Sequence, residues 1–257
     1  MTFFWPLAIW AVVLALHALV PAHAVEGYVR DANGNRLRYR LNGLRVFAIA
    51  IAAWAGACWA GWLRWDAFYV HRWQLAAGAC VLGVLLTLAI VLPFPRNKGL
   101  LADLFLGRLE NPQWRGVDAK MYLYLVGAML LELNVLSFTA FHLQTHAADP
   151  SPGVLVHAAL FSFFLVEYLN FEEVHLYTYD FMAERVGFKL GWGCLVFYPF
   201  FYPVGLWATA HLPLRKQVPG LMLLGREVGP ALVDDVGGPM VGSGVSLVER
   251  LEHRVFL

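Results

Sequence analysis

Long apolar runs separated by short polar stretches are the dominant pattern of the chain. Six of the runs approach the roughly 20 residues that a helix needs to cross the hydrocarbon core of a bilayer. These runs are Phe3–Val20, Leu44–Leu63, Leu75–Pro93, Met121–Phe141, Val154–Phe171 and Leu190–Ala210. The pattern predicts an all-α integral membrane protein with about six transmembrane helices.

The amino-acid composition agrees with that class. Hydrophobic residues make up 60% of the chain and charged residues 14%, whereas soluble domains average about 45–50% apolar and about 25% charged residues. The net charge is +1 and no basic patch stands out, so we expect no nucleic-acid partner. Cys58, Cys80 and Cys194 are far apart in the sequence, and we interpret them as small packing residues, not as a disulfide or metal site.

Positive charge predicts the orientation in the membrane. Most Lys and Arg residues before position 200 lie in the loops after the first, third and fifth runs, while the other loops hold only Arg64 and Arg72. Because cytoplasmic loops carry the excess of positive charge, these odd-numbered loops are predicted to be cytoplasmic. The basic residues beyond position 212 would lie on the opposite side in a six-helix arrangement, so either one run is misread or the tail does not follow the pattern.

The first run has two interpretations. Phe3–Val20 followed by Ala22-His23-Ala24 is similar to a signal peptide with a small-x-small cleavage site. The absence of preceding basic residues and the early Pro6 favour a retained helix. We therefore divide the chain into this first segment at residues 1–24, a membrane domain at 25–212 and an atypical tail at 213–257.

Two carboxylates lie deep inside apolar runs, at Glu132 and Glu167. Ionisable groups are costly in hydrocarbon, so each is a functional-site hypothesis by default. On a helix, Glu132 and Asn134 would point in different directions because they are two residues apart, whereas Glu167 and Asn170 would share a face.

Three polar stretches hold most of the remaining chemistry: Gly34–Leu44, Asp103–Lys120 and Glu167–Tyr202. The first reads as a turn and a basic juxtamembrane segment. Mixed charge, Gly107 and an Asn-Pro pair make the second an ordered connector that is not a helix interior and that packs back onto the membrane domain. The third places acids, amides, Thr and Tyr beside aromatic residues, which suits a pocket for a large apolar ligand with one polar end.

These three stretches, in this order, resemble motifs of the sterol reductases of ergosterol and cholesterol biosynthesis. That family includes the C-14, C-24(28) and C-7 double-bond reductases and the membrane domain of the lamin B receptor. Its pattern dGxrLxYrxNGL matches Gly34–Leu44, DfflGrelNPr…DlK matches Asp103–Lys120 with Gln113 where Arg is usual, and NEexyLxTxDixxdxfGfxlxwGxlvxxPfxY matches Asn170–Tyr202. The resemblance covers Val25 to Leu212 and implies the N-terminal half of the family fold.

The resemblance implies NADPH-dependent reduction of a sterol carbon–carbon double bond by protonation followed by hydride transfer. An isolated alkene is a poor hydride acceptor, so the proton must arrive first, in a site that excludes water. The donor must be protonated near neutral pH, which a phenol or a carboxyl group in apolar surroundings can be. The resemblance points to Tyr202 as the donor, with Glu167 and Asp180 as further donors, relays or cation-stabilising groups. The residues expected to contact the substrate are Glu132, Asn134, Thr178, Trp192 and Phe201.

Each candidate also has a purely structural interpretation. Tyr at the end of a transmembrane helix is common in the interfacial aromatic belt. Buried acids can bridge neighbouring helices through hydrogen bonds. An aromatic residue on a helix is more often a packing residue than a ligand contact.

The family motifs of the nicotinamide-binding half, such as NxQKxxFR and GWWGxxRHxNYxGD, are not found in these 257 residues. Residues 213–257 are instead rich in Gly, Val and Leu and show no sustained helical periodicity. The cofactor-binding residues are therefore unknown, and we expect impaired reductase activity for this chain alone.

Other classes of function stay open. The chain can be a non-catalytic sterol-binding membrane protein or a truncated pseudo-enzyme on the same fold. A membrane cytochrome would use His142, His146, His157, His175 or His211, and a transporter would show an inverted repeat, which the sequence lacks. The expected partners are a sterol or sterol-like lipid and the bilayer, in a bacterial inner membrane or the endoplasmic reticulum.

Overall fold

The computed structural model of the chain describes residues 2–30, 33–114, 116–170, 185–201, 203–211, 222–223 and 226–227. The chain divides into two compact units, one of residues 1–141 and 160–203 and the other of residues 142–159 and 204–257. The residues that line the candidate site all lie in the first unit.

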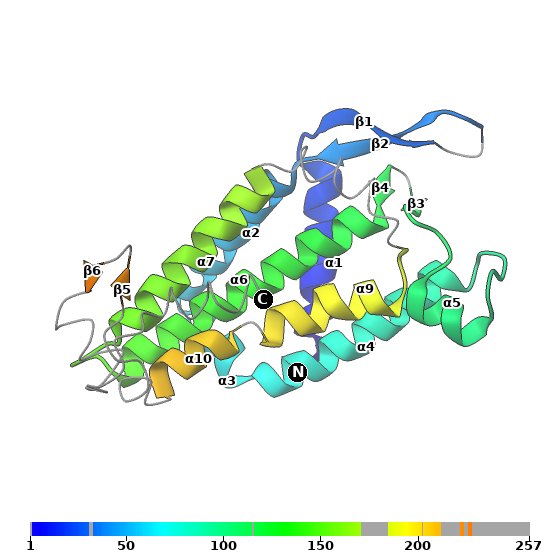
Figure 1. Cartoon of the computed structure of the whole chain (residues 1–257). Coiled ribbons are helices and arrows are strands. Elements are labelled where there is room, and N and C mark those ends of the chain that lie inside the picture. Colours follow the sequence, from blue (N-terminus) through cyan, green and yellow to red (C-terminus); the bar gives the residue numbers. More distant parts are fainter. Residues whose placement is uncertain are drawn as a thin grey trace. The chain divides into compact units, whose positions relative to one another are not determined.

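Helices dominate the described residues (Figure 1). Their bounds are η1 (Thr2–Phe4), α1 (Trp5–Leu19), α2 (Gly43–Trp59), α3 (Ala67–Val70), α4 (Arg72–Val91), α5 (Leu100–Leu106), α6 (Ala119–Thr145), α7 (Pro152–Asn170), α9 (Phe188–Trp192), the π-helix η2 (Gly193–Phe201) and α10 (Val204–His211). The strands form three separate antiparallel pairs, β1 (His23–Arg30) with β2 (Arg36–Leu41), β3 (Gln113–Trp114) with β4 (Val117–Asp118), and β5 (Met222–Leu223) with β6 (Arg226–Glu227).

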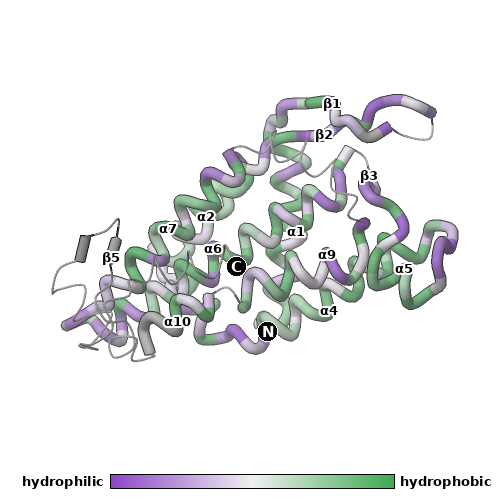
Figure 2. Tube along the Cα trace, in the orientation of Figure 1, coloured by the Kyte–Doolittle hydropathy of each residue, from purple (hydrophilic) through white to green (hydrophobic). Residues whose placement is uncertain are grey.

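The protein is an all-α integral membrane protein, as the apolar runs predict. Within the described ranges, five helical segments are long and apolar enough to cross a membrane: Thr2–Leu19, Arg72–Val91, Ala119–Thr145, Pro152–Asn170 and Phe188–Trp207. The second predicted run forms the shorter apolar helix α2, of 17 residues. Figure 2 shows hydrophobic residues along the helices, with hydrophilic residues on the β1–β2 hairpin and around α5.

Helix α4 is the packing partner of several other elements of the first unit. It contacts η1, α1, α9 and η2. The contact with η1 is close because Gly78 has no side chain: a Cβ atom there would collide with the carbonyl oxygen of Phe3. Leu75 and Val91, near the two ends of α4, are fully buried. This helix therefore holds the N-terminal helix and the α9–η2 segment in one unit.

The first polar stretch forms a β-hairpin, which the sequence interpretation as a juxtamembrane segment missed. Gly34 supplies the turn with a φ of 83°, a conformation that glycine adopts without steric cost. Val25 and Tyr39 are opposite each other in the ladder and form a small apolar cluster. The Tyr39 hydroxyl accepts a hydrogen bond from Asn111 Nδ2 at 2.6 Å, which joins the hairpin to the connector before α6.

The amide of Asn42 joins α1 to α2. Its Nδ2 donates to the carbonyl oxygens of His17 at 3.1 Å and Val20 at 2.9 Å. Arg45 donates to the carbonyl oxygen of Pro21 at 3.1 Å. The last carbonyl groups of a helix have no partner within the helix, so these side chains satisfy backbone groups at and just beyond the end of α1.

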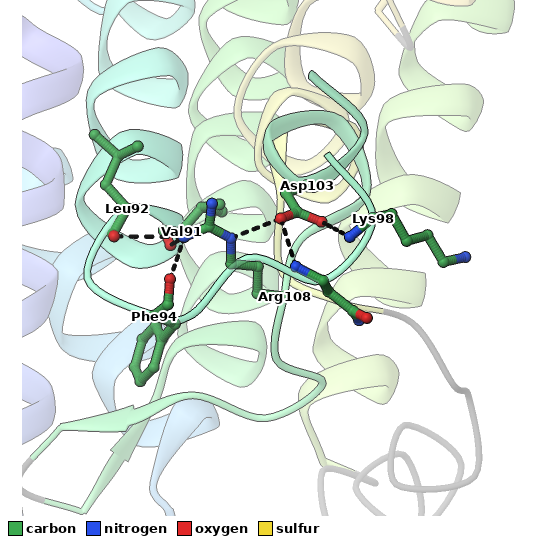
Figure 3. A network of polar contacts seen from close by, with 7 residues as sticks. Val91, Leu92, Phe94, Lys98, Asp103 and Arg108 are labelled. Atoms are coloured by element: carbon green, nitrogen blue, oxygen red, sulfur yellow. Dashed lines mark hydrogen bonds and ion pairs between the residues drawn. The ribbon is translucent and has the colours of Figure 1, made fainter. Parts of the chain in front are cut away.

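The second polar stretch contains a buried ion pair. Oδ2 of Asp103 accepts from Arg108 Nε at 2.9 Å and from the backbone N–H of Asn97 at 2.9 Å, while Oδ1 accepts from the N–H of Lys98 at 3.0 Å (Figure 3). Both side chains of the pair are buried, with 2% and 5% exposure. Asp103 lies in α5, so the expectation of a non-helical stretch is wrong for Asp103–Leu106.

Arg108 extends this network to the end of α4. Its Nη1 donates to the carbonyl oxygens of Val91 at 2.8 Å, Leu92 at 3.4 Å and Phe94 (Figure 3). The connector therefore packs back onto the membrane helices, as its apolar residues predict. We call the network of Asp103, Arg108 and these carbonyl groups the connector clamp.

Gly107, next to Arg108, connects the connector clamp to the segment before α9. Its φ is 90°, and a Cβ atom there would collide with the backbone of Val186. The N–H of Val186 donates to the carbonyl oxygen of Leu109 at 3.0 Å. The connector thus fixes the backbone two residues before α9 begins.

The connector clamp predicts a pH-dependent stability. The N–H groups of Asn97 and Lys98 and the Arg108 guanidinium hold the pKa of Asp103 below its ordinary value of about 3.9. A carboxylate with a depressed folded-state pKa stabilises the fold above its unfolded pKa, and this contribution is lost as the pH falls through the folded pKa. We expect Asp103→Asn to lower the Tm of the detergent-solubilised protein at pH 7, and the deficit to shrink below about pH 4.

Glu26→Gln is the matched control. Glu26 pairs with Arg38 at 3.4 Å on the surface, with 52% and 79% side-chain exposure, and exposed pairs contribute little. A Tm of D103N equal to that of E26Q at pH 7 would show that the clamp does not stabilise the fold.

Candidate functional site

A groove of about 310 Å³ lies between α6, α7 and η2 in the first unit. Helix α6 contributes Tyr124, Gly127, Ala128 and Leu131 at helical spacing, and α7 contributes Phe161, Phe164, Leu165 and Tyr168 at the same spacing. Cys194 and Tyr198 of η2 complete the lining. Each helix therefore turns one face toward the groove.

The groove depends on a close approach of α6 and η2. A Cβ atom at Gly127 would lie 2.6 Å from the carbonyl oxygen of Cys194 and 3.4 Å from its Cα atom. No side chain larger than hydrogen fits there without movement of the η2 backbone. The π-helix carries Pro199 in its interior, and π-helical turns are frequent at functional sites.

The lining is apolar with three phenol groups. Phe161 and Phe164 form part of one wall, and Tyr124, Tyr168 and Tyr198 add hydroxyl groups. Phe164 is 59% exposed and Tyr198 50% exposed. The groove is therefore open at its rim, on helices long enough to cross a bilayer.

Glu132 joins α6 to α7 beside the groove. The hydroxyl of Ser162 donates to Glu132 Oε1 at 2.7 Å. Glu132 is only 4% exposed, and its Oε2 has no hydrogen-bond partner in the part of the chain that the structure describes. The neighbours Leu131 and Phe161 both line the groove, so this polar bridge flanks it.

Asn134 and Glu167 have different surroundings. Asn134 donates to the carbonyl oxygen of Leu130 in its own helix at 2.7 Å, so its amide is used locally, in a different direction from Glu132. Glu167 is half-buried near the end of α7, next to the groove residue Tyr168. The structure therefore does not bring the carboxyl groups of Glu132 and Glu167 into one cluster.

The two aromatic candidates lie outside the lining of the groove. Trp192 stacks on Phe188 of α9, with ring centroids 6.1 Å apart, and its Cα atom approaches Gly83 of α4. Phe201 stacks on Phe197 at 5.5 Å and is 56% exposed. The candidates Tyr202, Asp180 and Thr178 lie outside the described residues.

The sequence interpretation did not select the three tyrosines of the groove or Ser162. The available signal was their spacing: small and aromatic residues recur three and four positions apart on both helices. The spacing alone does not show which other helix packs against these residues, so it does not predict a groove. Among the described residues, no cluster of three or more His, Cys, Asp or Glu side chains could hold a metal ion.

Comparison with known proteins places this arrangement in a family. The model of the Ergosterol biosynthesis ERG4/ERG24 family matches residues 1–223. The chain belongs to this family.

Two relatives illustrate the extent of the similarity. The chain is 26% identical over 217 residues to the Delta(14)-sterol reductase of Arabidopsis thaliana, covering 80% of this chain and 58% of the relative. It is 30% identical over 216 residues to the Delta(14)-sterol reductase of Methylotuvimicrobium alcaliphilum, covering 77% of this chain and 48% of the relative. A third relative is the Delta(14)-sterol reductase LBR of Gallus gallus, at 26% identity over 82% of this chain and 35% of the relative. The chain thus spans about half the length of the first two family members.

The close approach at Gly127 can be tested by a methyl group. We expect Gly127→Ala to lower the Tm in detergent, because overpacking against backbone costs about 1–3 kcal/mol. Gly193→Ala is the matched control. Gly193 is the first residue of η2, the helix that Gly127 contacts, and an added Cβ there has no atom within 4 Å. Equal Tm values for the two variants would mean that α6 and η2 are not in backbone contact.

Proposed function

We propose that the chain binds a sterol in the groove between α6, α7 and η2, and that it serves the reduction of a sterol carbon–carbon double bond. The observation that carries this proposal is the groove itself: an apolar, phenol-bearing cavity of about 310 Å³ between helices long enough to cross a membrane, in a member of a family whose relatives are sterol reductases. Ligand sites of this kind are mostly apolar with a few placed polar groups, and their volumes start at about 300 Å³.

The chain's own residues supply the environment for protonation. Apolar walls exclude water, which would otherwise capture a carbocation. The aromatic rings of Phe161, Phe164 and Tyr198 line the groove, and the face of an aromatic ring attracts positive charge at short range. The groove therefore suits a reaction in which positive charge develops on an apolar ligand.

The proton donor belongs to this proposal as well. Tyr202, Glu167 and Asp180 are our candidates, as donor, relay and cation-stabilising group. Tyr198 is a further phenol, and the structure places it in the groove lining. The substrate contacts expected from the sequence are Glu132, Asn134, Thr178, Trp192 and Phe201; those among them that the structure describes do not line the groove, so their contact with the sterol would lie beyond it.

NADPH would supply the hydride in this class of reaction. The residues described here do not include the family motifs that bind it, and the 257 residues span about half the length of the reductases that they match. The part of the reaction that we propose for these 257 residues is therefore sterol binding and proton donation.

Sterol binding is tested by filling the groove. Leu131→Trp places an indole in the lining, and we expect it to weaken the photolabelling of the purified protein by a photoreactive sterol about tenfold or more, because the ligand loses its cavity. Val81→Trp is the control, since Val81 is 45% exposed on α4 and does not line the groove. Labelling of L131W at the level of V81W would contradict the proposed site.

Turnover is a separate test. We expect the purified 257-residue chain to bind a sterol with a Δ14 double bond without oxidising NADPH. NADPH oxidation coupled to product formation would contradict this division, and its loss in the Tyr198→Phe or Tyr202→Phe variant would identify the proton donor. Binding without turnover would support the division of labour proposed above.

A further inference from the structure

A second cavity lies where three polar loops meet in the first unit. It measures about 480 Å³ and is lined by residues of the β1–β2 hairpin, of the connector between α4 and α6, and of the segment before α9. These are the loops whose positive charge predicts a cytoplasmic location. The cavity is separate from the sterol groove, with which it shares no lining residue.

The net charge of this cavity is positive. Arg30 and Arg185 line it with Glu110, and Arg108 also lines it with its own charge paired to Asp103. Among the described residues, neither Arg30 nor Arg185 forms an ion pair, and Glu110 forms none either. Two guanidinium groups therefore face the cavity without a neutralising partner in the described part of the chain.

Arg108 gives the cavity a rigid base. Its Nε and Nη1 are held by Asp103 and the carbonyl groups at the end of α4 (Figure 3). Arg30 is partly positioned too, because its Nη1 donates to the carbonyl oxygen of Gly34 at 2.7 Å. Planar guanidinium groups with fixed directions bind phosphate oxygens well, since their paired N–H groups match the phosphate geometry.

An apolar cavity adjoins the basic one. It measures about 450 Å³ and shares Phe94, Pro112 and Gln113 with the basic cavity as common walls. Trp10 and Leu14 of α1 and Ile90 of α4 contribute to its lining. A basic cavity and an apolar cavity side by side at the predicted cytoplasmic face match a molecule with an anionic head and a hydrocarbon chain.

We propose that these two cavities bind one anionic phospholipid, with its phosphate between Arg30, Arg108 and Arg185 and one acyl chain along Trp10, Leu14 and Ile90. Basic pockets between transmembrane helices on the cytoplasmic side are suited to anionic headgroups, since that leaflet carries the anionic lipids. A soluble phosphate compound would share the headgroup chemistry, but it would leave the adjoining apolar cavity unused.

The experiment counts lipids on the purified 257-residue protein by native mass spectrometry. Phosphatidylglycerol and phosphatidylcholine of equal chain length are compared. We expect the unaltered protein to prefer phosphatidylglycerol, and Arg30→Gln with Arg185→Gln to reduce that preference about tenfold or more, since each change removes hydrogen bonds to a charged group.

The matched control is Arg36→Gln with Lys189→Gln. It removes the same charge from the same two loops, because Arg36 faces Arg30 in the hairpin ladder and Lys189 is exposed at the start of α9. Neither residue lines the cavity. An equal loss of preference in the control would overturn the proposal, because net charge would then explain the binding.

Two further variants distinguish lost binding from unfolding, and a phospholipid from a soluble phosphate compound. Arg185→Lys keeps the charge but loses the paired N–H groups, so it is expected to keep part of the preference for phosphatidylglycerol, between the unaltered protein and the double variant. Leu14→Trp fills the apolar cavity and is expected to weaken phosphatidylglycerol but not pyrophosphate. Pyrophosphate that competes fully with the lipid, together with no effect of L14W, would overturn a lipid occupant and indicate a soluble phosphate.

Discussion

The buried pair of Asp103 and Arg108 is the interaction on which the first unit depends. Arg108 satisfies carbonyl groups at the end of α4, and Asp103 holds both Arg108 and the backbone of Asn97 and Lys98. A buried pair is stabilising only when its remaining donors and acceptors are also bonded, and this network meets that condition for the carboxylate. Next to the clamp, Gly107 packs on the backbone of Val186, whose N–H donates to Leu109, so the clamp helps to position the start of α9 and then of η2.

The groove is a consequence of that placement. Because α9 and η2 start from a fixed position and pack on α4, η2 meets α6 at Gly127 with backbone in contact. Beside this contact at Gly127, side chains of α6, α7 and the π-helix η2 line the groove. The Glu132–Ser162 bridge then ties α6 to α7 beside it. A rigid polar frame outside the bilayer and a small-residue contact inside it thus produce one apolar cavity.

The sequence predicted the class and the helices well because apolar runs of bilayer length have few alternatives. It also located the connector as an ordered element that packs back on the membrane domain. It missed the β1–β2 hairpin although Arg36–Leu41 alternates basic and apolar residues, as a half-exposed strand does, because the arginines were interpreted only as the positive charge of a cytoplasmic loop. It missed the phenols at Tyr124, Tyr168 and Tyr198, because they lie on three different helices. The sequence does not show which faces of those helices pack together.

The hydrogen bond between Tyr39 and Asn111 has a consequence for the order of assembly. It joins residues 72 positions apart, and the connector then binds the segment at residue 186, another 77 positions from Leu109. Contacts of such long sequence separation form only after the intervening helices have been synthesised and inserted. The basic cavity at the junction therefore cannot close during biogenesis until the residues before α9 have been synthesised and reach the hairpin and the connector.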